Sequence, residues 1–86
     1  MIEKQLVSGE QLVRIINDRL HEYDDCRECY IKGEVASLRH PDSDGCNWSR
    51  DLELRCSSRS GGICREIAIN IINEVARKYN LKEVSM

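Results

Sequence analysis

The pattern of apolar and polar residues changes period along the chain and predicts two helices and two strands. Near the N-terminus, one face of a helix of 3.6 residues per turn collects the apolar side chains Leu12, Val13, Ile15, Ile16, Leu20 and Tyr23. Ser8 followed by Gln11 matches the capping box, and Val7 precedes the cap as a hydrophobic staple does. We therefore predict a first helix over residues 9–24 with one buried face.

The period then shortens to two, which is typical of β-strands. In CYIKGEVASL, residues 29–38, Cys29, Ile31, Gly33 and Val35 alternate with Tyr30, Lys32 and Glu34. In RDLELRC, residues 50–56, one face holds Leu52, Leu54 and Cys56. These stretches predict an antiparallel hairpin. Its connection, at roughly ten residues, is longer than the two to five usual for hairpins.

A second helix is predicted over residues 63–80, after the break SSRSGG. Its core face holds Cys64, Ile67, Ala68, Ile71, Ile72, Val75 and Tyr79, and Arg77 and Lys78 occupy the last turn, as the helix dipole prefers. Ile63 and Ile69 fall outside the centre of that face. Apolar residues on the sides of a helix indicate a second neighbour, either the first helix or a dimer partner.

The order of elements predicts a single α+β domain over residues 1–86. We expect a two-layer α-β-β-α arrangement in which the two helices pack on one face of the antiparallel hairpin. A two-stranded ribbon is marginal alone and would gain from a third strand. The termini, residues 1–7 and 81–86, could each supply one, and two hairpins could instead pair edge to edge across a dimer axis.

Composition is that of an ordinary globular domain. The 86 residues are 41% hydrophobic and 33% charged. This composition differs from the low hydrophobicity and high net charge of disordered proteins, so we expect the chain to fold. The net charge of −2 and the scattering of Lys and Arg among acids disfavour nucleic acid as a partner. No apolar run has the length of a membrane span or signal peptide, so we expect a cytoplasmic protein without a membrane partner.

The five cysteines raise the question of metal or thiol chemistry. A strand's length, about 25 Å, separates Cys46 from the base of the hairpin. The only workable zinc set is Cys26, Cys29, Cys56 and Cys64, which begins with the C-x-x-C spacing of CREC. Burial of reduced cysteines as small hydrophobes is the favoured interpretation, with no metal or cofactor bound. A thioredoxin-like role is disfavoured because CREC follows a helix and enters a strand.

The segment before the second helix is a candidate anion site. Backbone N–H groups at a helix start, together with a nearby cation, form an anion-binding geometry, and the candidates are Arg59, Ser60, Gly61 and Gly62. RSGGIC resembles the pyrophosphate loop of GNAT acetyltransferases, matched at Arg59 and Gly62 but not at Cys64. That resemblance implies binding of a coenzyme A-like ligand. The competing interpretation is an ordinary helix cap at Ser60 or Gly62.

The connection HPDSDGCNWS, residues 40–49, contains the third set of candidates, namely His40, Asp42, Asp44, Gly45, Cys46, Asn47 and Trp48. A catalytic Cys46 would need His40 as its base and an aspartate to orient the histidine. Calcium is disfavoured because the ligand positions of an EF-hand are not filled. Turn chemistry explains more of the stretch, with Pro41 and Gly45 shaping the turn and Trp48 folding back over the core.

PDSDGCNWS also resembles a Gly-Cys-Asn-Trp-Ser element of short uncharacterised bacterial proteins that end in a helix with a stretch like ARKYNL. The resemblance implies the α-β-β-α order and no particular activity. We therefore predict a small non-enzymatic interaction or regulatory module, either a homodimer or bound to another protein. The alternatives are a thiol-based or anionic-ligand protein using Cys46 or the 59–62 loop, and a small zinc-binding domain.

Overall fold

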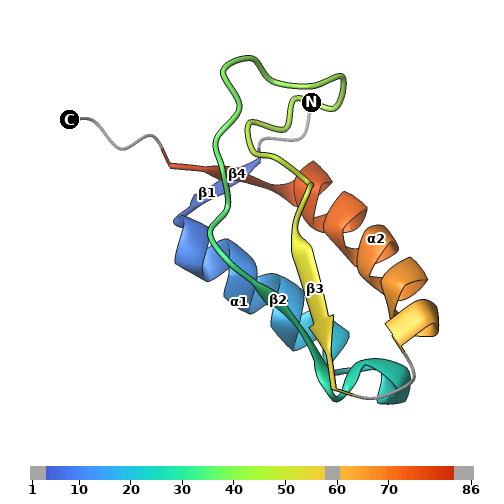
Figure 1. Ribbon diagram of the computed structural model, residues 1–86. Helices are drawn as coiled ribbons and strands as arrows, with labels where there is room; N and C mark the ends of the chain where they lie inside the picture. The colour runs from blue at the N-terminus through green and yellow to red at the C-terminus, as the bar shows by residue number, and fades with distance from the viewer. Residues whose placement is uncertain (1–3, 58–60, 83–86) are drawn as a thin grey trace.

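The computed structural model describes residues 4–57 and 61–82, and these residues form a mixed α+β domain. In chain order the elements are β1 (Gln5–Val7), α1 (Gly9–Leu20), the 3-10 helix η1 (Asp24–Cys26), β2 (Cys29–Lys32), β3 (Glu53–Cys56), α2 (Gly61–Lys78) and β4 (Tyr79–Leu81). Figure 1 shows the β2–β3 hairpin lying across the two helices, with β3 on the side of α2. The predicted α+β class is confirmed.

Helix α1 begins where the sequence predicts and ends earlier. Ser8 accepts a hydrogen bond from the backbone N–H of Gln11, and the Gln11 side chain accepts one from the N–H of Ser8, so the capping box is complete. The helix ends at Leu20 rather than at residue 24, because the chain then tightens into turns that lead to η1. Tyr23 consequently leaves the predicted buried face and is 44% exposed.

A short strand, β4, directly follows helix α2, although the sequence pattern predicted that the helix continues to residue 80. The helix ends at Lys78, and Tyr79, predicted on its core face, is instead the first residue of β4. This strand pairs in parallel with β1, in the register Gln5 to Tyr79 and Val7 to Leu81. Both ends of the chain therefore supply a strand, as the sequence allowed, but these strands pair with each other in a separate two-stranded sheet rather than with the hairpin.

The hairpin is shorter than predicted and its connection is twice as long. Strand β2 stops at Lys32 because Gly33 takes a positive φ of 107°, and β3 starts only at Glu53. The connection therefore spans residues 33–52. An isolated bridge between Ser37 and Trp48 holds its two halves together.

The core lies between the hairpin and the two helices and includes part of the long connection. Its largest fully buried side chains are Trp48, Leu12, Ile16, Leu20, Val75, Cys26, Cys29, Cys46 and Cys64. Ile63 and Ile69 of α2 lie outside it, at 58% and 53% exposed, in agreement with the periodicity. Four of the five cysteines are therefore buried in this core.

Candidate functional site

Four cysteines from four elements meet at one end of the hairpin. Cys26 of η1 is disulfide-bonded to Cys64 of α2, and Cys29 of β2 is disulfide-bonded to Cys56 of β3. The second pair follows from the strand register, which places Cys29 directly opposite Cys56 with a Cα–Cα distance of 4.1 Å. The first pair, with a Cα–Cα distance of 5.2 Å, ties the start of the hairpin to α2.

The two cysteine pairs form one cluster, which we call the four-cysteine centre. The sulfur atoms of Cys29, Cys56 and Cys64 all lie within 4.8 Å of one another, and Cys26 is bonded to the last of these. Three of the four side chains are buried, and only Cys56 is half-buried. The prediction of small buried cysteines is therefore right for Cys29 and Cys64 and only partly right for Cys56. It is wrong for their pairing, since the described structure holds them as disulfides rather than as reduced thiols.

The same four sulfurs match the donor set of a tetrahedral zinc site. Zinc binds thiolates at about 2.3 Å, which places neighbouring sulfurs about 3.8 Å apart. The sulfurs of Cys29, Cys56 and Cys64 already lie within 4.8 Å of one another, whereas the sulfur of Cys26 lies outside that group and has to move toward it once the S–S bonds are open. The set is the one selected from the sequence, and its ligands come from η1, β2, β3 and α2.

The fifth cysteine, Cys46, lies apart from this centre, in the connection. It is the free cysteine, it is buried, and its thiol donates to the backbone oxygen of Trp48 at 3.3 Å. His40 is exposed, and no hydrogen bond between the two side chains is found in the described parts of the chain. The structure thus places the candidate base outside the packed region that holds the candidate nucleophile.

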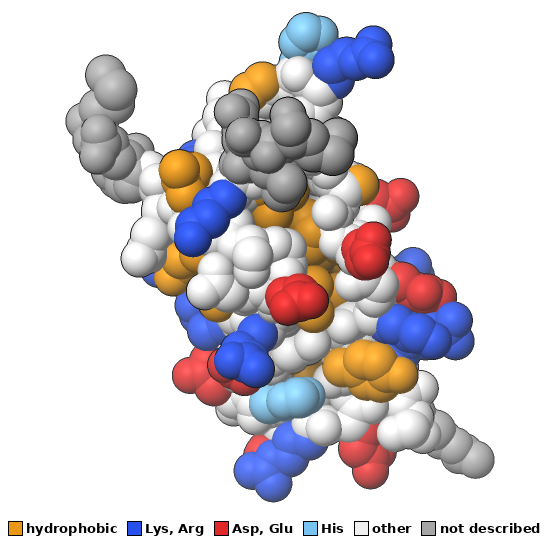
Figure 2. All heavy atoms as spheres, turned by 90° about the vertical axis from the view of Figure 1, so that its left-hand side faces the viewer, with side chains coloured by type: hydrophobic (Ala, Val, Ile, Leu, Met, Phe, Trp, Pro, Cys, Tyr) orange, Lys and Arg blue, Asp and Glu red, His pale blue; other side chains and the backbone are white. Residues whose placement is uncertain are grey.

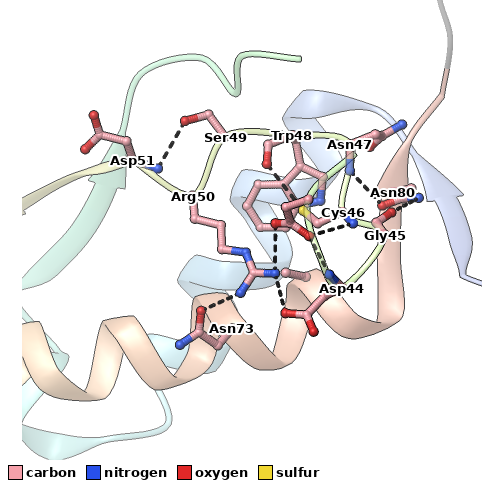
Figure 3. Close-up of polar contacts among 12 residues, drawn as sticks. Asp44, Gly45, Cys46, Asn47, Trp48, Ser49, Arg50, Asp51, Asn73 and Asn80 are labelled. Atoms are coloured by element: carbon pink, nitrogen blue, oxygen red, sulfur yellow. Dashed lines mark hydrogen bonds and ion pairs between the residues drawn. The ribbon is translucent and has the colours of Figure 1, made fainter. Parts of the chain in front are cut away.

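The aspartates of the connection bind an arginine that the sequence reasoning did not select. Arg50 lies 3.1 Å from an oxygen of Asp42 and 2.8 Å from one of Asp44, and it also donates to Asn73 of α2 at 2.8 Å. Figure 3 shows Arg50 reaching down to α2 from the connection. In place of the predicted role in orienting His40, these aspartates form ion pairs with Arg50 inside the connection, and the hydrogen bond from Arg50 to Asn73 attaches the connection to α2.

The contacts of this network favour the charged forms of Arg50 and Asp42. The Asp44 hydrogen bond raises the pKa of Arg50, reinforced by the charge of Asp42 and opposed by partial burial. Partial burial acts to raise the pKa of Asp42, but the backbone N–H groups of Cys46 and Asp44, together with Arg50, lower it overall. Asp42 is thus a carboxylate that accepts two backbone hydrogen bonds while facing a guanidinium.

Asn47 and Trp48 attach the connection to β4. The Asn47 amide oxygen accepts from the Leu81 N–H at 2.8 Å, and its amide nitrogen donates to the Leu81 oxygen at 3.1 Å. The Trp48 indole N–H donates to the Tyr79 oxygen at 3.0 Å. Gly45 takes a positive φ of 77° in the turn that precedes them, as its predicted turn role requires. These residues satisfy the backbone of an edge strand and hold the connection in place.

Two of the four residues of the candidate anion site lie outside the described residues. Arg59 and Ser60 belong to that undescribed segment, and Gly61 and Gly62 form the start of α2. On the face of the molecule seen in Figure 2, Lys and Arg side chains are interspersed with Asp and Glu. Neither described α-helix combines the length and the apolar character that a membrane crossing requires.

Comparison with known proteins returns no relative. No protein-family model, no curated protein and no solved structure matches the chain. The resemblances to a Gly-Cys-Asn-Trp-Ser element and to a GNAT pyrophosphate loop therefore stay predictions.

Proposed function

We propose that the protein is a small non-enzymatic regulatory module whose four-cysteine centre responds to zinc and to thiol oxidation. The observation that carries the proposal is the convergence of Cys26, Cys29, Cys56 and Cys64, three of whose sulfurs lie within 4.8 Å of one another. In the proposed module the helices form one layer and the hairpin the other. The state of the centre then controls how the hairpin is held against α2.

The proposed centre has two forms, one with zinc bound and one with two disulfides. In a reducing cytoplasm, where disulfides are rare, the four thiolates hold one zinc ion, and the predicted cytoplasmic location belongs to this form. In an oxidising setting the same sulfurs form the Cys26–Cys64 and Cys29–Cys56 disulfides. Either form crosslinks the same elements, so the domain keeps its fold while the metal and the thiols are exchanged.

The conversion between the two forms balances with a peroxide as the oxidant. Four zinc-bound thiolates give up four electrons, four Zn–S bonds break, two S–S bonds form and one Zn²⁺ ion leaves. Two molecules of hydrogen peroxide accept these electrons together with four protons from the solvent and become four molecules of water. A dithiol reductant reverses the step and restores the zinc ligands.

The test is metal and mass analysis of the same protein in both states. Protein that is reduced without air, stripped by a chelator and reloaded with zinc chloride should retain about one zinc per chain after desalting. Peroxide should then release that zinc to a chromogenic chelator and leave a chain about 4 Da lighter, as two disulfides require. Peptide mapping should find Cys26 joined to Cys64 and Cys29 joined to Cys56.

Two variants provide the controls. Cys64→Ala removes a residue of the centre and should abolish stoichiometric zinc, whereas Cys46→Ala removes the buried cysteine outside it and should leave the stoichiometry unchanged. Reduced wild-type protein that binds no zinc while remaining folded would refute the proposal. Zinc lost equally from both variants would also contradict it, because the metal would then depend on folding rather than on the centre.

A further inference from the structure

The β2–β3 hairpin has two long edges, and helix α1 covers one of them. On the outer edge of β2, the Asn17 side chain accepts from the Ile31 N–H at 2.7 Å and donates to the Ile31 oxygen at 3.3 Å. A ring nitrogen of His21 lies 3.0 Å from the Cys29 oxygen. Side chains of α1 and of its C-cap residue thus take the positions that a neighbouring strand would occupy, so this edge is closed to pairing.

The outer edge of β3 has no such cover among the described residues. The Ser57 N–H bonds to the Glu28 oxygen at 3.1 Å, which fixes that pair as a hydrogen-bonded one in the ladder. By the alternation of antiparallel pairs, Leu54 and Cys56 then direct their backbone N–H and C=O groups away from β2. No residue within 4–57 or 61–82 forms a hydrogen bond with these groups. An open edge of this kind is a template for another strand.

A groove runs between this open edge and α2. It has a volume of about 840 Å³, and its walls include Leu52 and Leu54 on the strand side and Arg65, Ala68 and Ile69 on the helix side. Ile69 is 53% exposed there, although it is a large apolar residue. A strand added to β3 would lie over α2 and cover Ile69. Such a strand would explain why this apolar side chain is exposed in the single chain.

The sequence of β3 is complementary to itself in antiparallel pairing. When two copies pair about a two-fold axis at Leu54, Glu53 stands opposite Arg55 of the partner subunit, and Arg55 stands opposite the partner's Glu53. Both side chains are more than half exposed, and in the single chain they pair with each other at 2.9 Å. Opposite charges directly across a strand pair stabilise it, and here the symmetry provides that contact twice.

We propose that β3 is a dimerisation edge at which a second copy of this chain adds its own β3. The two hairpins then form one four-stranded antiparallel sheet, which removes the open edge and gives the marginal ribbon the additional strands it lacks. The charge complementarity selects a second copy over an unrelated extended peptide, since Glu53 and Arg55 meet their opposites only in the symmetric register.

The test is sedimentation equilibrium combined with charge reversal. Wild-type protein should associate to dimers over about 10 μM to 1 mM, as a short strand interface allows. Glu53→Arg and Arg55→Glu should each weaken self-association about tenfold, because like charges then face each other twice. An equimolar mixture of the two variants, and the double variant, should recover dimers, because both restore opposite charges across the axis.

Lys32→Glu is the matched control. It reverses a charge at the β2 position that pairs with Glu53, away from the proposed interface, so it should leave association unchanged. Circular dichroism confirms that each variant is folded before its association is measured. A wild-type monomer at 1 mM overturns the proposal, including one that captures an extended peptide instead. A mixture that associates no better than its separate components also overturns it, because the dimer would then use another surface.

Discussion

Opening both disulfides of the metal-free protein should remove most of its stability. The Cys26–Cys64 bond closes a loop with a sequence separation of 38, and the Cys29–Cys56 bond closes one of 27 inside it. Loop-closure entropy assigns the outer crosslink about 4 kcal/mol. The inner one adds less than it would alone, because the outer bond already brings its ends near each other.

The size of that second contribution follows from the nested arrangement. With Cys26 and Cys64 joined, the remaining path between Cys29 and Cys56 runs through three positions on one side and eight on the other. A loop of this length corresponds to about 3 kcal/mol, which makes the total about 7 kcal/mol. Small domains are stable by about 5–15 kcal/mol, so reduction without metal should leave the chain close to its unfolding transition.

Urea titration followed by tryptophan fluorescence measures this directly. Trp48 is the only tryptophan and is fully buried, so its emission reports exposure of the core. We expect a large fall in the urea midpoint on reduction in the presence of a chelator, and recovery when zinc replaces the chelator. An unchanged midpoint in the reduced, metal-free protein would contradict this expectation, because the crosslinks would then contribute nothing beyond the packing of the core.

Two further predictions concern side chains that hold the connection and the hairpin. The lowered pKa of Asp42 means that its carboxylate stabilises the fold above its ordinary pKa and stops doing so as the pH falls through the lower folded value. Asp42→Asn, which loses the charge facing Arg50, should therefore lower the urea midpoint at about pH 7 and match the wild type once the pH is below the lowered folded pKa of Asp42. Asn17→Ala leaves the Ile31 backbone groups without partners and should cost about 1–3 kcal/mol in denaturant unfolding, whereas Asn70→Ala on the exposed face of α2 should cost little.

Local signals in the sequence predicted the elements better than their ends. The capping box of α1 was predicted because Ser8 and Gln11 act within one turn. The end of β2 was missed because Gly33 continued the alternation in the sequence, while its positive φ breaks the strand. The start of β4 at Tyr79 was missed because a strand of three residues carries no period that separates it from the preceding helix.

The candidate site likewise contains some contacts that the sequence predicted and others that depend on tertiary structure. The zinc set selected from the sequence already groups Cys29 with Cys56, and the strand register makes them direct partners. The bond between Cys26 and Cys64 depends on η1, whose turn brings its cysteine to α2 and which no periodicity marks. Arg50 was missed because its partners are tertiary contacts in the connection and on α2, and a charged residue at a strand start gives no local sign of them.

The four-cysteine centre and the proposed dimer edge share β3, so the state of one should alter the other. Cys56 belongs both to the Cys29–Cys56 disulfide and to the open edge, and that crosslink keeps β3 ordered before a partner arrives. Without it, dimerisation must also order the strand, at about 1–2 kcal/mol for each residue fixed. Cys29→Ala with Cys56→Ala should therefore weaken self-association at least tenfold in oxidised, folded protein, while Cys46→Ala should not. Equal dimer affinity in sedimentation of the two variants would mean that the edge is ordered by packing alone and that the centre does not regulate it.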